Sequence, residues 1–378
     1  MNEFIDIEPY NDAEAVEALS KVANHPGVIM ISKYLFPYER PTFLRDLMVN
    51  INSIDEFQRI VMSQAVEWCL NNTTHEFTYS GIENLKESNG KFLMVSNHRD
   101  IIVDPALTQY VLLKNGIDLS QIAVGDNLLS NQTVEYLLRS NRMIKVIRGI
   151  SARELFLSSQ LLSKYIRKTI TSGESSVWIA QRQGRTKDGL DTTEQGLLKM
   201  LDMSGAGGFK ENFMELGIYP LSISYEYEPC DIRKAREILI SKDRKYVKRP
   251  NEDLHSIIIG LRQQKGDVHL TIGSRLSEEA IDKASEFDKN DRYQQIRHEL
   301  DRRVVEGYKL WKTNYLSYDI VNKTSKYSSY YTREDVERFE AYTEHKLDKV
   351  ERFLDREALR DIFLRIYANP VLSKETLV

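Results

Sequence analysis

The sequence predicts an α/β fold in which a mostly parallel sheet is flanked by helices, with helical extensions at both ends of the chain. Two observations lead to this prediction. Short apolar runs, typical of buried strands, alternate with longer runs whose apolar residues recur every three or four positions, as in helices. Successive strand-like runs also end in polar or glycine-bearing turns, which parallel strands would bring to one edge of the sheet. We therefore expect a ligand site at that edge.

Length and composition limit the kind of protein. The 378 residues suffice for one large domain or two, and 29% charged with 41% hydrophobic residues is ordinary for a soluble globular protein. A net charge of −4 argues against a nucleic-acid binder. Cys69 and Cys230 lie far apart in apolar surroundings, which predicts reduced core cysteines in a cytoplasmic protein. The scattered histidines show no metal-ligand spacing, so no metal site is predicted.

Residues 1–79 are predicted to form a helical N-terminal region packed on the core. Apolar residues recur at helical spacing in residues 14–22 and 41–69. An amphipathic helix on a membrane surface is the alternative, but the polar face mixes both charge signs, so packing on the core is favoured. The N-terminus does not read as a signal peptide, and no apolar run approaches the roughly 20 residues of a membrane-spanning helix. The protein is therefore expected in the cytoplasm, with any membrane contact peripheral and from one side.

The central part of the chain, residues 80–231, is predicted to carry the sheet. It begins with a turn at residues 80–85. Ser151 and Glu154 form a capping box that predicts the start of its longest helix. The expected strands span residues 92–95, 121–124, 143–147, 176–180 and 218–224, and the expected helices span residues 106–113, 151–170 and 196–203.

Residues 232–378 are predicted to hold the remainder of the α/β domain and a helical C-terminal region. Residues 267–274 alternate between apolar and polar side chains, which predicts a half-exposed strand with His269 at the surface. Residues 323–331 are expected to be a loop. The expected helices span residues 233–241, 253–262, 294–311 and 332–354.

The loop after the first core strand is the strongest candidate for catalysis. It contains His98, and a neutral imidazole beside a carboxylate acts as a general base. Asp100 and Asp104 are both candidates for that carboxylate, and the sequence leaves the choice open. Asp104 opens a helix together with Pro105, which suits a first helical turn. A loop histidine that only caps the helix is the competing interpretation.

A second polar segment, residues 181–189, follows the fourth core strand and is centred on Gly184. Guanidinium groups bind phosphate through paired hydrogen bonds, and glycine allows the backbone to approach an oxyanion. A solvated run of charges is the alternative, but the position at the end of a buried strand favours anion binding. The spacing of a nucleotide-binding P-loop is missing. The cations expected at this edge are Arg148, Arg182, Arg185 and Lys187.

Taken together, these features resemble the glycerolipid acyltransferases, the PlsC-like lysophosphatidate and glycerol-phosphate acyltransferase family. Asn97-His98 resembles the family's first block, although five residues separate His98 from Asp104 where the family has four. Gln183 stands where the family has Glu, and Arg185 precedes Thr186, which reverses the usual order. The pattern most resembles a Bacteroidetes-type cytoplasmic branch. Further similar segments are residues 81–85, 143–148, 179–186 and 218–223.

The resemblance implies transfer of a fatty acyl group from acyl-CoA or acyl carrier protein to a hydroxyl of glycerol-phosphate, lysophosphatidate or a similar phosphorylated acceptor. It implies phospholipid synthesis and no cofactor. His98 would deprotonate the hydroxyl, and Asp104 or Asp100 would orient the imidazole. The residues expected to bind substrate are Asn97, Arg99, Arg148, Arg182, Gln183, Gly184, Arg185 and Lys187.

Two other functions remain open at this point. A catalytically weak, acyltransferase-like lipid-binding protein would fit the altered spacing and the neutral Gln183. A thioester hydrolase would use His98 to activate water and would need no phosphorylated acceptor. The Gly-x-Ser-x-Gly turn of a serine nucleophile is missing from the sequence.

Overall fold

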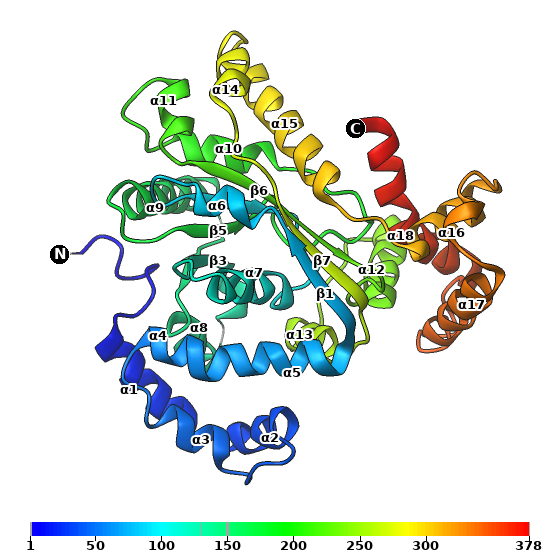
Figure 1. Ribbon diagram of the computed structural model, residues 1–378, viewed down its shortest axis with the longest axis horizontal. Helices are drawn as coiled ribbons and strands as arrows, with labels where there is room; N and C mark the ends of the chain where they lie inside the picture. The colour runs from blue at the N-terminus through cyan, green and yellow to red at the C-terminus, as the bar shows by residue number, and fades with distance from the viewer. Residues whose placement is uncertain (1, 130, 149–150, 378) are drawn as a thin grey trace.

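The computed structural model describes residues 2–129, 131–148 and 151–377. Its centre is a seven-stranded sheet in the order β1-β7-β6-β2-β5-β3-β4 (Figure 1). Neighbouring strands are parallel except β6 and β7, which run antiparallel. The mostly parallel α/β fold predicted from the sequence is therefore confirmed. The strands are β1 Thr74–Ser80, β2 Leu93–Ser96, β3 Gln121–Gly125, β4 Met143–Val146, β5 Val177–Ala180, β6 Ile218–Tyr225 and β7 Gly266–Ile272.

Helices cover both faces of the sheet, which explains why its central strands are continuously apolar. In β5, Val177 and Ile179 pack in one core with Ile166 of α9. Trp178, between them, points the other way and packs in the opposite core with Val111 of α7. The elements between the core strands are α6 Ile82–Lys86, α7 Val103–Lys114, η2 Asp126–Leu128, α8 Gln132–Arg139, α9 Ala152–Thr171, α10 Gln195–Asp202 and α11 Phe209–Met214.

The predicted boundaries are close for most core elements. Ser151 caps α9 through the expected capping box with Glu154. A short helix, α6, replaces the turn predicted at residues 80–85. Strand β1 was not predicted, because it is a polar edge strand whose side chains are half-buried or exposed and show no clear alternation.

The N-terminal helices pack beside α8, whose Tyr136 and Leu137 contact their apolar cluster. The predicted helical run at residues 41–69 is interrupted at residues 49–53, which carry two asparagines and lie between α3 and α4. The turns from residue 54 onward include a π-helix. These elements are α1 Asp12–Ala23, α2 Pro26–Leu35, α3 Phe43–Met48, α4 Ile54–Glu56, η1 Phe57–Met62 and α5 Ser63–Thr73.

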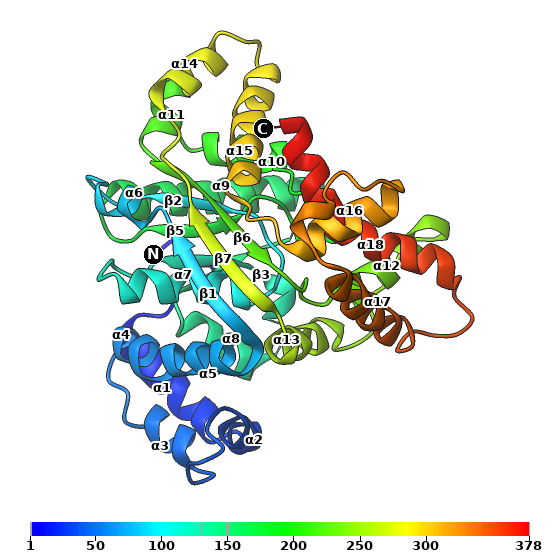
Figure 2. The ribbon, with the colours of Figure 1, turned by 45° about the vertical axis from the view of Figure 1, so that its right-hand side comes forward.

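Helices α16, α17 and α18 gather on one side of the molecule, away from α1, α2 and α3 (Figure 2). Their core joins Leu316, Phe339 and Phe363 from α16, α17 and α18. Two predicted helices are shorter than expected: α15 ends at Gly307, before Trp311 caps α16, and α17 ends at Leu347. The elements are α12 Asp231–Asp243, α13 Glu252–Arg262, α14 Glu278–Ser285, α15 Asp291–Gly307, α16 Lys312–Asn322, η3 Ser328–Tyr330, α17 Arg333–Leu347 and α18 Arg356–Leu377.

His269 is not the surface residue that the alternation in β7 predicted. Its ring is half-buried beside the neighbouring strand β1, where Nδ1 lies 2.7 Å from Thr78 Oγ1 and Nε2 lies 3.0 Å from Ser80 Oγ. Burial lowers the pKa of His269, because the charged imidazolium loses hydration. The alternation identified the strand but not the partner that covers it.

Two further expectations can be compared with the structure. Cys69 and Cys230 are free and buried, as predicted for reduced core cysteines. None of the helices in the described ranges combines the length and the apolar character needed to span a bilayer.

Candidate active site

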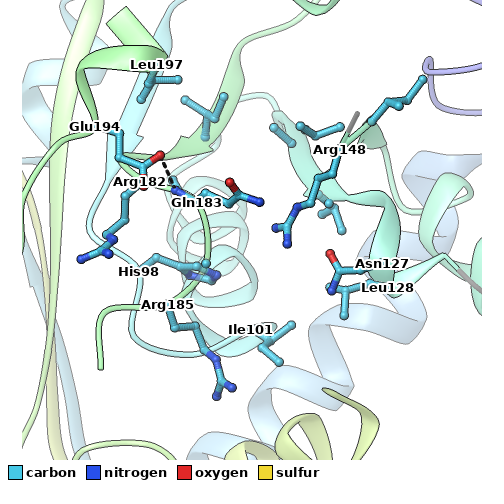
Figure 3. A pocket seen from close by; sticks show the side chains of 18 of the residues that line it. His98, Ile101, Asn127, Leu128, Arg148, Arg182, Gln183, Arg185, Glu194 and Leu197 are labelled. Atoms are coloured by element: carbon cyan, nitrogen blue, oxygen red, sulfur yellow. Dashed lines mark hydrogen bonds between the residues drawn. The ribbon is translucent and has the colours of Figure 1, made fainter. Parts of the chain in front are cut away.

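A pocket of about 390 Å³ lies at the carboxyl ends of β2, β3, β4 and β5. Each of these strands contributes residues to its lining: His98 follows β2, Gly125 ends β3, Arg148 follows β4, and residues 182–187 follow β5. The prediction that these four turns meet at one edge of the sheet is therefore confirmed. Figure 3 shows His98 and residues 182–185 on one side of the pocket, with Arg148 and Asn127 on the other.

The imidazole of His98 is held by Asp104. His98 Nδ1 lies 3.0 Å from Asp104 Oδ2, and the ring packs edge-on against Trp178. Because a carboxylate can only accept hydrogen bonds, the proton of the neutral imidazole lies on Nδ1, which donates to Asp104. The other ring nitrogen, Nε2, is then an unprotonated acceptor, and it has no hydrogen bond within the described ranges. A histidine in this state can take a proton from a bound hydroxyl.

Asp104 is fixed by more than the histidine. Its Oδ2 also accepts from the backbone N–H groups of Arg99 at 2.5 Å and Asp100 at 2.8 Å, and its Oδ1 accepts from the hydroxyl of Tyr225 at 2.6 Å. Burial, and next to it the negative charge of Asp104, raises the pKa of Tyr225 well above its usual value. The hydroxyl therefore stays protonated and remains a donor. These bonds orient the carboxylate in the first turn of α7.

Asp100 has a different role in the structure. Its Oδ1 accepts from the backbone N–H groups of Ile102 at 3.0 Å and Val103 at 2.9 Å, where α7 begins. Its Oδ2 faces Gly260 of α13, where an added Cβ would lie only 2.0 Å away. The sequence left Asp100 and Asp104 as alternatives, and the contact with His98 is made by Asp104.

Five cations line the pocket, and three of them form no ion pair with a carboxylate within the described ranges: Arg148, Arg182 and Arg185. Arg148 lies across the end of β3, so close that an added Cβ on Gly125 would be 2.6 Å from its Nη2. Its guanidinium faces the middle of the pocket, whereas Arg182 and Arg185 extend towards the ends (Figure 3). Lys187 differs, because its ammonium pairs with Glu237 of α12.

In the turn that follows β5, two arginine nitrogens are buried without a hydrogen-bond partner. They are Nε of Arg182 and Nη1 of Arg185. Buried donors in folded proteins are nearly always paired with protein, water or a ligand. Gly184, between them, has a φ of +75° and open space around the position of a Cβ. The turn therefore offers charged donors and an accessible backbone to a negatively charged group.

The acidic side chains of the lining are already engaged, so they leave the three arginines unbalanced. Glu237 pairs with Lys187, and Glu194 accepts from the backbone N–H of Gln183 at 3.1 Å. Asp253 pairs with Lys248 at 2.6 Å. Burial alone would raise the pKa of Asp253, but its bond to Lys248 outweighs this and lowers the pKa. The pocket is consequently cationic around His98.

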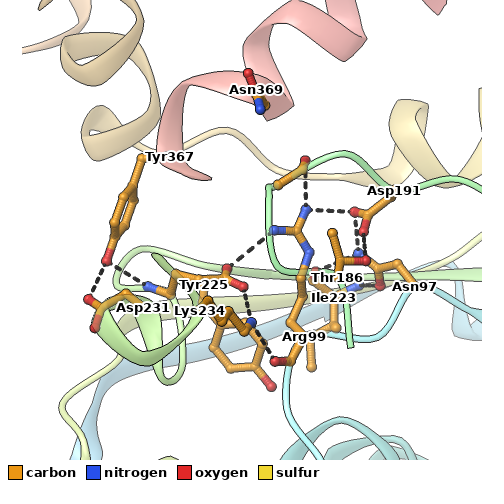
Figure 4. Close-up of polar contacts among 12 residues, drawn as sticks. Asn97, Arg99, Thr186, Asp191, Ile223, Tyr225, Asp231, Lys234, Tyr367 and Asn369 are labelled. Atoms are coloured by element: carbon orange, nitrogen blue, oxygen red, sulfur yellow. Dashed lines mark hydrogen bonds and ion pairs between the residues drawn. The ribbon is translucent and has the colours of Figure 1, made fainter. Parts of the chain in front are cut away.

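Asn97 and Arg99 do not line the pocket, which corrects the prediction that they bind substrate. Both are fully buried beneath it. The amide of Asn97 bridges to β6, accepting from Ile223 N at 2.8 Å and donating to Ile223 O at 3.0 Å. The guanidinium of Arg99 bonds Asp191 at 2.7 Å and Glu228 at 3.3 Å (Figure 4). Proximity to His98 in sequence did not reveal that these side chains point away from the site.

A buried polar network therefore supports the site from below. Asp191 accepts from Arg99, from Asn97 at 2.9 Å and from Thr186 at 2.8 Å. The backbone N–H of Thr186 in turn donates to the carbonyl of His98 at 2.7 Å. The network thus ties the histidine loop to the cationic turn. No local pattern in the sequence identifies Asp191, because its partners Asn97 and Arg99 lie about 90 residues away.

Lys234 and Glu228 extend the network to α12. Lys234 Nζ donates to the carbonyl of Arg99 at 2.7 Å and pairs with Glu228 at 2.5 Å. Burial alone would lower the pKa of Arg99, but the carboxylates of Asp191 and Glu228 outweigh it and raise the pKa well above the usual value. The guanidinium stays charged and holds both carboxylates.

Replacing Arg99 with methionine is expected to lower the free energy of unfolding by about 3–5 kcal/mol, because the buried carboxylate of Asp191 loses its cation and that of Glu228 keeps only Lys234. Urea denaturation measures this loss. Arg333→Met removes an exposed pair with Glu337 and should have little effect. A change for Arg99→Met as small as that of this control would contradict a supporting role for the network.

Comparison with known proteins relates part of the chain to a known family. An acyltransferase family model matches residues 76–226, which contain the histidine loop and the cationic turn. No curated protein sequence matches the chain. Among solved structures, the chain is similar to the 1-acyl-sn-glycerophosphate (LPA) acyltransferase, PlsC, from Thermotoga maritima, with 14% identity and a TM-score of 0.38 over 78% of this chain and 95% of that chain.

Proposed function

Residues 76–226 form an acyltransferase domain, as the resemblance to the glycerolipid acyltransferases predicted, and from this premise we propose the reaction that follows. The protein transfers a fatty acyl group from acyl-CoA or acyl carrier protein to a hydroxyl of glycerol-phosphate, lysophosphatidate or a similar phosphorylated acceptor, in phospholipid synthesis. It works in the cytoplasm or peripherally on the inner face of the membrane. One observation carries the proposal: the His98–Asp104 pair faces a pocket in which three arginines, Arg148, Arg182 and Arg185, lack carboxylate partners among the described residues.

In the proposed mechanism, Nε2 of His98 removes the proton from the acceptor hydroxyl as its oxygen attacks the thioester carbonyl carbon. Asp104 stabilises the imidazolium that forms. The tetrahedral intermediate then collapses, the carbon–sulfur bond breaks, and the proton on His98 passes to the departing sulfur. The products are an ester and a free thiol. Backbone N–H groups at the Gly184 turn would stabilise the oxyanion.

The phosphate of the acceptor lies, in this proposal, between Arg148 and the turn of residues 182–185. The buried, unpartnered nitrogens of Arg182 and Arg185 support this placement, since a phosphate oxygen would satisfy them. Gln183 and Lys187 complete the wall of the pocket. Its apolar lining suits the carbons next to the thioester and includes Ala123, Val146, Leu162, Leu197 and Met200.

An acyl-transfer assay with a panel of acceptors tests the proposal. Glycerol-phosphate and lysophosphatidate are compared with glycerol and monoacylglycerol, using acyl-CoA and acyl carrier protein as donors. Ester formation that requires the phosphate supports the proposal. Release of thiol and free fatty acid without an acceptor would identify a thioester hydrolase instead. Lipid binding without turnover would identify a catalytically weak relative.

Replacing Arg148 or Arg185 with alanine is expected to raise the acceptor KM, or lower kcat/KM, by about ten- to a hundred-fold. Each variant removes a charge-assisted hydrogen bond, which contributes roughly 1.5–3 kcal/mol. Arg→Lys should rescue only part of the loss, because an ammonium cannot form the paired bonds of a guanidinium. Steady-state kinetics in both substrates measures the effect.

The donor KM should change little in these variants. Arg333→Ala, an exposed change on α17, serves as the matched control and should leave both KM values unchanged. An unchanged acceptor KM for both Arg148→Ala and Arg185→Ala would rule out the phosphate clamp.

A further inference from the structure

The N-terminal end of α9, at the entrance of the pocket, is unusually apolar and exposed. Leu155, Phe156 and Leu157 are consecutive and are 51%, 53% and 52% exposed. Leu155 also lines the pocket. Three consecutive residues of a helix point in different directions, so the protein does not shield this turn on any side. Exposed apolar groups of this kind mark a surface that contacts something else.

A second exposed segment borders the same pocket from the other side. Lys248, in the segment before α13, and Asp253, at the start of α13, line the pocket. Val247, next to Lys248, is 77% exposed, and Leu254 on α13 is 50% exposed. The entrance is thus bordered by apolar side chains from two distant parts of the chain. We call residues 151–157 and 242–258 together the pocket rim.

One part of the pocket rim, residues 242–250, is also basic. Residues 242–250 contain five basic residues and one acidic residue in sequence, counted as Lys242, Arg244, Lys245, Lys248 and Arg249 against Asp243. Lys242, Arg244 and Lys245 are exposed, and no carboxylate pairs with them in the ranges that the structure describes. Arg153 adds a further exposed cation on α9. Unpaired cations beside exposed apolar side chains are the pattern of an interface with anionic lipid.

We propose that the pocket rim docks on an anionic membrane surface, with Phe156, Leu157 and Val247 inserted between the lipid headgroups. This inference rests on the proposed function, because docking would let an alkyl chain pass between the bilayer and the pocket. Phe156 and Leu157 project from a helix end and Val247 from a loop, and none of the three lines the pocket. A projecting arrangement favours a deformable lipid surface over a folded protein partner.

Co-sedimentation of the full chain with vesicles tests this surface. Vesicles of phosphatidylcholine alone are compared with vesicles that also contain phosphatidylglycerol. Each basic residue near an anionic surface contributes about a five-fold gain in binding, so Arg244→Glu/Lys245→Glu should weaken binding to anionic vesicles by at least about 25-fold. Phe156→Ser/Leu157→Ser should weaken it by about ten-fold or more, because less apolar surface is inserted.

The loop between α17 and α18 supplies matched controls. Phe353 is 80% exposed and lies near the exposed cations Lys349 and Arg352, but none of the three lines the pocket. Phe353→Ser and Lys349→Glu/Arg352→Glu should leave vesicle binding unchanged. Equal losses in the controls and the rim variants would overturn the proposal, since any exposed basic and apolar site would then suffice.

Transfer assays in the same variants separate the surface from the chemistry. With a short-chain acyl-CoA and glycerol-phosphate, both soluble, the rim variants should keep their rate. Vesicle binding needs no turnover. If the full chain shows no transfer activity but still binds anionic vesicles through the rim, the proposed function is wrong and the proposed membrane surface stands. Unchanged vesicle binding in both rim variants would overturn the surface. If those variants instead lost only transfer from acyl carrier protein, the rim would be a protein-docking site.

Discussion

Replacing His98 with alanine is expected to lower kcat by about 10²–10⁴-fold with the fold preserved. The variant removes the proposed general base, a residue of the pocket lining whose Nδ1 lies 3.0 Å from Oδ2 of Asp104. The acceptor KM should change far less, since the arginines that bind its phosphate are untouched. Steady-state kinetics gives both parameters.

His298→Ala is the control for this variant, because His298 is exposed on α15 and lies outside the pocket. It should behave as wild type. Circular dichroism and a thermal melt establish that His98→Ala is folded. A folded His98→Ala protein with nearly normal kcat would remove the general base from the mechanism and leave binding as the function of the site.

The elements that could be predicted from the sequence are those defined by local patterns. Strand β5 is an apolar run between polar segments, and α9 begins at a capping box, so both can be located without tertiary information. The edge of the sheet that carries the site follows from the same patterns, since parallel strands end together. Strand β1 has no such pattern, because only one side of it pairs with the sheet.

The polar network beneath the site could not be predicted in the same way. Arg99 follows His98, and its charge suggested a phosphate ligand. The direction of its side chain depends on Asp191 and Glu228, which reach it only through the folding of distant segments. A buried arginine needs such partners to offset its lost hydration, and nothing in the spacing of these residues marks them as a pair. Its role is therefore visible only in three dimensions.

The sequence left Asp100 and Asp104 as alternatives because the segment between His98 and Asp104 is one residue longer than in the family that the sequence resembles. Sequence distance favoured neither residue clearly, because Asp100 is nearer to His98 and Asp104 is nearer to the helix. In the structure, the backbone N–H groups of residues 99 and 100 both donate to Asp104, which places its carboxylate beside His98. Asp100 is left to bind the start of α7.

This division of roles predicts that Asp104→Asn lowers kcat by two to four orders of magnitude, whereas Asp100→Asn lowers it by less than about ten-fold. At position 104, the amide oxygen would take the place of Oδ2, because that atom also accepts from the backbone N–H groups of Arg99 and Asp100. The proton on Nδ1 of His98 would stay in place, but the imidazolium that forms in the reaction would lose the carboxylate charge that stabilises it. At position 100, asparagine caps a helix as well as aspartate does, so the start of α7 should be preserved.

Kinetics of the two variants with the same donor and acceptor gives the comparison, and nitrogen NMR of His98 reports which ring nitrogen carries the proton. Both variants should keep the proton on Nδ1, so the loss of rate in Asp104→Asn would come from the lost charge and not from a changed tautomer. The donor and acceptor KM values should change little in Asp104→Asn, an outcome that a merely structural role of Asp104 would not produce. A larger loss of kcat in Asp100→Asn, or a nearly normal kcat in a folded Asp104→Asn, would show that the carboxylate of Asp104 does not stabilise the imidazolium.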